Sequence, residues 1–253
     1  MKRAAAVVAW LAAGHLVLGA FYWALLQVPE SNVFMLTTSL LLVVTMALWT
    51  GLIEGTALLA WSAKGAVTPS ITTALRRSWL VVLPLALVAL VWWLTGLADS
   101  WFARHAGEID AWLLVKTGWT HTSGLHATIT WLVAFLKYGV GASAALALFA
   151  ALVSKGLAGL ASLAWLRQAF GWRQLAGIAI SLFAGVALPW RLAYWRPASL
   201  SATWVEPVFA GVKLFAMFIV MNVAWAVVLW IVARQASTDT PPPAVSKAVE
   251  LAA

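Results

Sequence analysis

Four polar side chains interrupt otherwise apolar runs of this sequence, and their positions point to chemistry inside a membrane. They are His15, Asn222, Lys137 and Lys213. An ionisable or strongly polar group is costly in hydrocarbon, so such residues are functional candidates by default. We therefore predict a candidate intramembrane polar site from these four residues. A transport function would require all four to converge on one cavity.

Depth separates the two lysines from the other two residues. Lys213 comes two residues after Gly211, near the outer edge of its run, and its stem can extend a further ~5–6 Å outward. Sixteen apolar residues separate Lys137 from Ser154, about 24 Å along a helix, so its amine can also reach the outer edge. The alternative for Lys137 is a side chain that faces the interior of the bundle.

His15 and Asn222 lie deeper than the lysines. His15 follows Arg3 by twelve residues, about 18 Å along a helix, and Asn222 is near the middle of its run. The purely structural alternative is that each bonds a neighbouring helix, for about 0.6–2 kcal/mol. Glu54, by contrast, is predicted to lie at the inner headgroup edge, near the basic residues of the following loop.

A second, weaker group of candidates lies between the third and fourth apolar runs. It comprises His105, Glu108, Asp110, His121 and His126. These residue types can bind metal ions, but their spacing fits no zinc motif. The sequence has no cysteine and no recognisable catalytic signature, so we expect a solvated loop and predict no catalytic residue, metal or cofactor.

The composition places these residues in a membrane protein. Of the 253 residues, 64% are hydrophobic and 9% are charged, whereas soluble domains carry about 25% charged residues. The formal net charge is +8, but the basic residues fall in short loops between apolar runs. This distribution argues against a nucleic-acid partner and favours contact with a lipid bilayer.

Six apolar runs are long enough to cross about 30 Å of hydrocarbon as helices. They lie near 4–28, 33–61, 79–98, 128–153, 175–195 and 207–233. We predict an all-α, polytopic membrane helical bundle of six transmembrane helices within residues 1–234, followed by a disordered cytoplasmic tail, 235–253. The long outer loop, 99–127, is predicted to contain a short interfacial helix.

Lysines and arginines predict the orientation of the chain. Ten lie on the side of the N-terminus and four on the opposite side, which indicates an N-in/C-in protein of a plasma membrane, in particular a bacterial inner membrane. The alternative for the first run is a cleaved signal peptide, because "MKR" precedes an apolar stretch.

Two inner loops show an internal similarity. Residues 64–79 and 155–170 share Lys-Gly, ten residues, Arg, two residues and an aromatic residue, at an offset of 91. This pattern favours a parallel duplication of helical hairpins 2–3 and 4–5, with a short helix in each inner loop. The alternative is that the positive-inside rule alone places basic residues in both loops.

Three functional hypotheses follow from the sequence. The leading one is a non-enzymatic membrane component, such as a scaffold, an assembly factor or a subunit of a complex. It implies partner membrane proteins or a homo-oligomer. The first alternative is a small-solute or lipid transporter or channel-like protein with a polar site inside the bundle. The second is a membrane enzyme with an outer-face histidine and carboxylate site.

Overall fold

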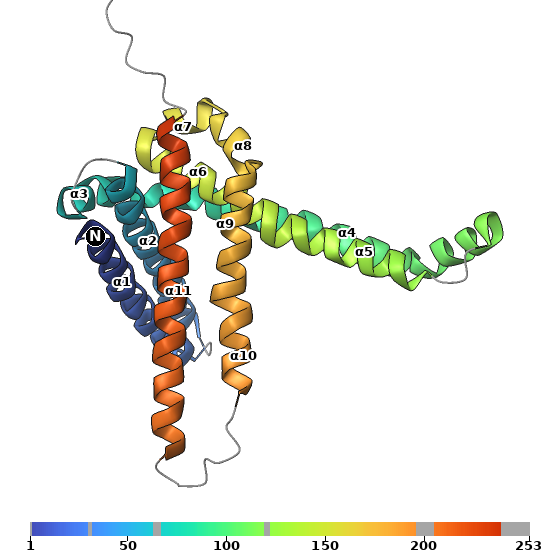
Figure 1. Cartoon of the computed structure of the whole chain (residues 1–253), viewed down its shortest axis with the longest axis horizontal. Helices are drawn as coiled ribbons and strands as arrows, with labels where there is room; N and C mark the ends of the chain where they lie inside the picture. The colour runs from blue at the N-terminus through green and yellow to red at the C-terminus, as the bar shows by residue number, and fades with distance from the viewer. Residues whose placement is uncertain (1, 30–31, 63–66, 119–121, 196–204, 239–253) are drawn as a thin grey trace, which may run out of the picture.

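The computed structural model describes residues 2–29, 32–62, 67–118, 122–195 and 205–238, and all regular structure in these ranges is helical (Figure 1). The long helices are α1 (Lys2–Gln27), α2 (Val33–Ser62), α4 (Val82–Thr117) and α11 (Val205–Thr238), while α5 (Ser123–Ala134) continues through a π-helical segment, η2 (Phe135–Val140), into α6 (Gly141–Lys155). The shorter elements are α3 (Val67–Arg77), η1 (Ser78–Val81), α7 (Ala158–Ala161), α8 (Ala164–Ala169), α9 (Trp172–Leu182), η3 (Phe183–Ala187) and α10 (Leu188–Tyr194).

Five helices of the described part are long and apolar enough to cross a membrane, where only helices and closed barrels can satisfy every backbone polar group. They are Lys2–Gln27, Val33–Ser62, Val67–Thr117, Ser123–Lys155 and Glu206–Ala236. The predicted all-α class and the prediction of several membrane spans are confirmed. The sixth run, near 175–195, corresponds to α9, η3 and α10 and is not among these five, so the count of six stays a prediction.

The buried core lies at one end of the long helices. In α1 only Val7, Leu11 and Gly14 are buried, and α2 buries side chains only from Gly51 onward. In α11 the buried residues all follow Met221. The N-terminus, α3, α7 and α8 lie at this same end (Figure 1). We call this region the hub, because the helices meet there and separate beyond it.

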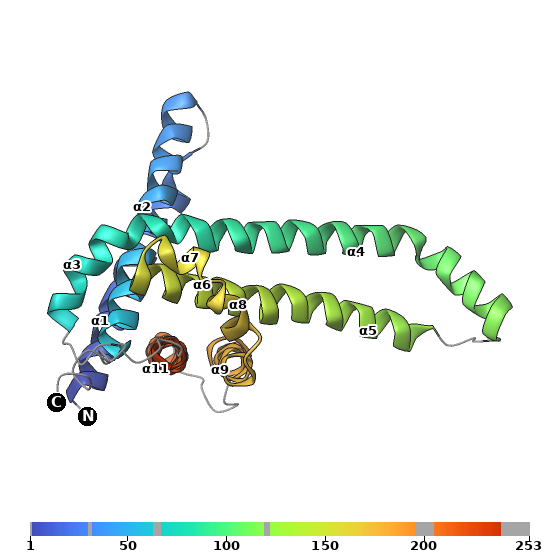
Figure 2. The same cartoon turned by 90° about the horizontal axis from the view of Figure 1, so that it is seen from above.

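Helices α4 and α5 form an arm that projects from the hub. They lie side by side and run crosswise to α9 and α11 (Figures 1 and 2), and the bundle of six transmembrane helices stays a prediction. Only Pro84 is buried in α4, and no residue is buried in α5. Large apolar side chains, such as Trp93 and Trp131, are therefore exposed along the arm.

The predicted outer loop at 99–127 is helical over most of its length, because α4 continues without a break to Thr117. The helix that we expected within this loop is therefore present, but as part of α4. This stretch is polar but rich in residues with high helix propensity, and the polarity misled the prediction. The helix ends where Gly118 adopts a left-handed conformation (φ 69°) and donates its N–H to the Leu114 carbonyl at 3.0 Å.

Both inner loops contain short helices, as predicted, although the duplication itself stays a prediction. In the first loop, Arg77 donates to the Val153 carbonyl. After the second loop, Gln174 donates to the Ser143 carbonyl at 2.6 Å. Helix α11 continues to Thr238, and the remainder of the predicted tail lies outside the described residues.

Candidate functional site

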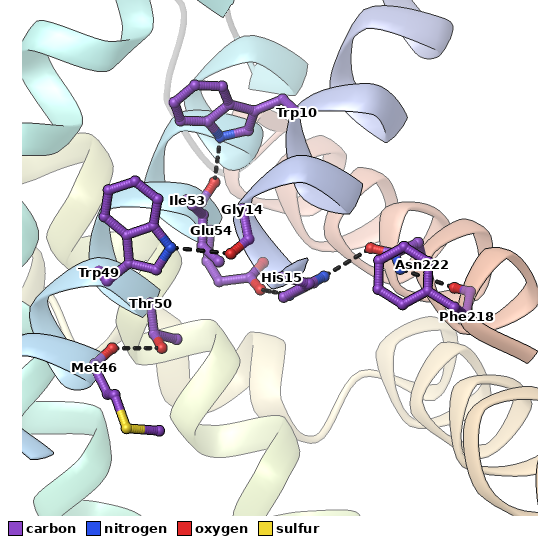
Figure 3. A network of polar contacts seen from close by, with 10 residues as sticks. All are labelled: Trp10, Gly14, His15, Met46, Trp49, Thr50, Ile53, Glu54, Phe218 and Asn222. Carbon is purple, nitrogen blue, oxygen red and sulfur yellow. Dashed lines mark hydrogen bonds and ion pairs between the residues drawn. The ribbon is translucent and has the colours of Figure 1, made fainter. Parts of the chain in front are cut away.

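The side chain of His15 joins three helices that meet at the hub. Its Nε2 lies 3.0 Å from Oε1 of Glu54 on α2, and its Nδ1 lies 2.7 Å from Oδ1 of Asn222 on α11. Figure 3 shows the imidazole between the carboxylate and the amide. We call His15, Glu54 and Asn222 the polar cluster.

The hydrogen-bond chemistry of Asn222 determines which atom of His15 is a donor. The Nδ2 of Asn222 donates to the Phe218 carbonyl at 2.8 Å, so its Oδ1 faces the imidazole. A carbonyl oxygen only accepts, and Nδ1 of His15 must therefore carry a proton. The hydrogen bond between Nε2 and Glu54 then requires one more proton, which either the imidazole or the carboxyl group holds. The arrangement shares one proton between His15 and Glu54.

The side chains of the polar cluster are largely buried within the protein. Asn222 is fully buried and Glu54 is 6% exposed, whereas His15 is half-buried. Among the described residues, Oε2 of Glu54 has no hydrogen-bond partner, which leaves the carboxyl group one unused acceptor. An unsatisfied buried polar atom costs about 1–3 kcal/mol, so this atom is a position where a ligand would be favoured.

Two tryptophans fix the register of α1 against α2 around the cluster. Nε1 of Trp49 donates to the Gly14 carbonyl at 3.0 Å, and Nε1 of Trp10 donates to the Ile53 carbonyl at 3.1 Å (Figure 3). These carbonyls belong to the residues directly before His15 and Glu54. A Cβ at residue 14 would collide with the Ile53 side chain, so the two helices can approach this closely only with glycine there.

The cluster lies far from the basic ends of its helices. His15 follows Arg3 by twelve residues, and Asn222 precedes Arg234 by twelve residues. Each interval is about 18 Å along a helix, more than half of a ~30 Å hydrocarbon core. These intervals place His15 and Asn222 well inside two candidate spans, and Glu54, which contacts His15, belongs to a third.

Two cavities reach the pair formed by His15 and Glu54. His15 lines an open groove of about 610 Å³, together with Tyr22, Met46 and Phe218. Glu54 lines a second, smaller cavity of about 120 Å³, with Trp225 among its walls. The shared proton therefore lies beside space that a small molecule can enter.

Of the four predicted intramembrane candidates, the structure brings only His15 and Asn222 together. The ammonium of Lys137 lies 4.1 Å from the Trp92 ring centroid on α4. Lys213 donates to the Trp195 carbonyl at 2.8 Å. It precedes Asn222 by nine residues, which is about 13 Å along α11. Neither lysine contacts the polar cluster.

Glu54 is the site residue that sequence reasoning missed. Counting twenty residues from Val33 put it at the headgroup edge, but α2 has 30 residues and its carboxyl group is buried against His15. The carboxyl group is thus buried between helices, whereas its depth in the membrane stays a prediction. The available signal was that Glu54 is the only ionisable residue between Val33 and Ser62.

The weaker candidates are mostly dispersed. His126 Nε2 lies 2.8 Å from Oδ1 of Asp110, which joins the tips of α5 and α4. His105 Nδ1 donates to the Trp101 carbonyl at 2.8 Å, and Glu108 is exposed. His121 lies outside the described residues. Within the described ranges, no three histidine or acidic side chains gather as a metal site would require.

Comparison with protein-family models, with curated proteins and with solved structures finds no match to this chain.

Proposed function

We propose that this protein is a transport or channel-like protein of a bacterial plasma membrane, and that His15 and Glu54 bind the proton it moves or exchanges. In this proposal the chain has six spans and both termini lie inside. Small solutes and lipids are the candidate substrates. The leading sequence hypothesis, a scaffold, becomes the second candidate.

The observation that carries this proposal is the bridging position of His15. Its two ring nitrogens bond a carboxyl group and an amide from two other candidate spans. Chains of carboxyl groups and histidines inside membranes are the usual carriers of proton relays. Histidine also exchanges its proton near neutral pH more readily than other side chains.

The groove beside His15 supports a transport role for the pair. Rotation of α11 would separate Asn222 from Nδ1 of His15, because that bond is the contact between α1 and α11 within the cluster. The imidazole would then exchange its proton with a solute or water in the groove of about 610 Å³. The open acceptor of Glu54 would receive a proton from the smaller cavity.

The test is proton flux into liposomes that contain the purified full-length protein and a pH-sensitive dye. We expect a membrane potential to drive more flux with the protein than without it. His15→Gln and Glu54→Gln should each reduce this flux to that of empty liposomes. His105→Gln is the matched control, because the hydrogen bond and the ring stacking of His105 are both with Trp101 on its own helix.

Infrared spectroscopy of the same samples provides a second measurement. We expect a protonated-carboxyl band in the unaltered protein that disappears in Glu54→Gln and persists in Glu108→Gln, where an exposed glutamate is changed. Unchanged flux and an unchanged carboxyl band in the His15 and Glu54 variants would mean that the cluster only holds helices together.

The arm favours the second candidate, a non-enzymatic scaffold that assembles with a second copy of itself. Its exposed apolar side chains lie on helices with almost no buried residue, so these helices have little packing within one chain. The cysteine-free sequence allows a direct test. After addition of a thiol oxidant such as copper phenanthroline to native membranes, Leu94→Cys on α4 should give disulfide-linked dimers, whereas Leu214→Cys on α11 should not. Monomers alone from both variants would contradict self-assembly through the arm.

A further inference from the structure

We infer that the cleft between α9 and α11 binds an anionic phospholipid, with the lipid phosphate between Arg173 and Arg234. The cleft has a volume of about 530 Å³ and lies between two helices that run side by side at the hub (Figures 1 and 2). Its walls include Trp172, Arg173 and Ile180 from α9, and Trp230, Ile231 and Arg234 from α11. The proposal is independent of the polar cluster.

Helical spacing places the cleft residues on facing surfaces. Arg173 and Ile180 are seven residues apart and therefore share one face of α9, about 10 Å apart along its axis. Trp230 and Arg234 are four residues apart and share one face of α11. A Cβ on Gly177 would lie 3.0 Å from Cδ1 of Ile231, so the two helices approach closely at this position of the cleft wall.

The guanidinium group of each arginine lies over the ring of a neighbouring tryptophan. The Cζ atom of Arg173 lies 5.6 Å from the Trp172 ring centroid, and that of Arg234 lies 4.5 Å from the Trp230 ring centroid. Stacking on a ring fixes the plane in which a guanidinium presents its N–H groups. Two such groups on opposite walls match the oxygens of a phosphate group, which arginine binds through paired hydrogen bonds.

The gradient of polarity along the cleft favours a lipid over a soluble anion. Both arginines lie near the hub ends of their helices, whereas Ile180 is farther along α9 and is 59% exposed. A molecule that fills the cleft thus needs a charged head at one end and an apolar chain at the other. Basic pockets between membrane helices at the cytoplasmic side are suited to anionic headgroups.

Native mass spectrometry of the full-length protein in detergent tests this site, with phosphatidylglycerol as the probe and phosphatidylcholine as the neutral comparison. Arg173→Gln and Arg234→Gln should each weaken phosphatidylglycerol binding about fivefold, and the double variant about thirtyfold, which corresponds to about 1 kcal/mol for each basic residue. Ala176→Phe, which adds bulk to the wall, should weaken binding without changing charge. Arg167→Gln is the matched control, an exposed arginine at the same end but outside the cleft.

The outcomes distinguish a lipid phosphate from a free phosphate ion, and binding at the cleft from non-specific attraction to positive charge. Equal losses in Arg167→Gln and in the cleft variants would overturn the site in favour of non-specific attraction, and unchanged binding in a folded double variant would also overturn it. Displacement of phosphatidylglycerol by millimolar inorganic phosphate would assign the site to a free anion and refute the lipid. Phosphatidylcholine binding as tight as phosphatidylglycerol binding would refute the phosphate contact. Thermal unfolding of each variant verifies that it is folded.

Discussion

The ammonium group of Lys137 lies 4.1 Å from the centroid of the Trp92 ring and 5.3 Å from that of Tyr138. Lys137 belongs to the π-helical segment between α5 and α6. Such a segment is a local widening of the helix that is frequent at functional sites. A positive charge within an apolar run thus meets aromatic faces in place of a carboxylate. The contact explains how this segment accommodates the lysine without adding it to the polar cluster.

A double-mutant cycle should detect the contact between Lys137 and Trp92. We expect Lys137→Met and Trp92→Leu to show a coupling free energy of about 0.5–2 kcal/mol, because each variant alone removes the cation–π interaction. Detergent-induced unfolding of the purified protein measures it. The control cycle pairs Lys213→Met with Trp92→Leu and should be additive within about 0.5 kcal/mol. Equal coupling in the two cycles would contradict the assignment.

Two glycines of α1 should respond oppositely to the same substitution. Gly14→Ala should lower the free energy of unfolding by about 1–3 kcal/mol, because the added Cβ collides with Ile53. Gly19→Ala has open space around the new Cβ and should be neutral or stabilise by up to about 1 kcal/mol. Unfolding curves of both variants check this, and equal effects would argue against the close approach of α1 and α2.

Replacing His15 and Glu54 with leucine should separate the contribution of the polar cluster to stability from its contribution to proton flux. His15→Leu or Glu54→Leu alone should destabilise the protein by about 3–5 kcal/mol, since each leaves a buried polar partner unpaired. The double variant should recover most of this loss and retain only the cost of the unpaired Asn222 amide, about 1 kcal/mol. Proton flux should be absent from all three variants. Recovery of flux in the stable double variant would exclude the pair as the proton site.

The contact between Asp110 and His126 should contribute little, because both side chains are about one-third exposed. We expect His126→Ala to lower the free energy of unfolding by less than about 1 kcal/mol at low salt, as for exposed ion pairs. The difference should shrink in 1 M salt, where charges are screened within about 3 Å. A loss well above 1 kcal/mol that persists in high salt would show that the tip of the arm is coupled to the hub.

The features best predicted from the sequence were the helical class and the presence of several membrane spans, because both follow from hydropathy. Long apolar runs predicted the helical class and several spans, because lipid forces the backbone into helices. The boundary at Asp99 failed because polarity alone does not end a helix, and no proline follows until Pro189. The crosswise arm was beyond prediction, since helix directions depend on packing between segments that are distant in the sequence.

The candidate site was predicted in part. The distance of His15 from Arg3 and the middle position of Asn222 in its run placed both residues deep, and they meet at 2.7 Å. Counting from Val33 did not reveal that Glu54 is buried against His15, because a helix longer than the bilayer has no fixed starting depth. Rotation about the helix axis decides which side chains face each other. In α2, the contacts of Trp49 and Ile53 with α1 fix this rotation. The stretch is uniformly apolar, so it has no hydrophobic periodicity from which these contacts could have been predicted.

The bond between His15 and Asn222 has a consequence for the order in which the protein is made. The two residues are 207 positions apart, whereas His15 and Glu54 are separated by only 39. A ribosome that adds about 5–20 residues per second delivers Asn222 roughly 10–40 s after His15. Throughout that interval the nascent α1–α2 hairpin displays a histidine N–H with no amide to receive it. Until α11 is made, Nδ1 of His15 therefore lacks its Asn222 acceptor, and a chain truncated before α11 exposes this polar position between α1 and α2.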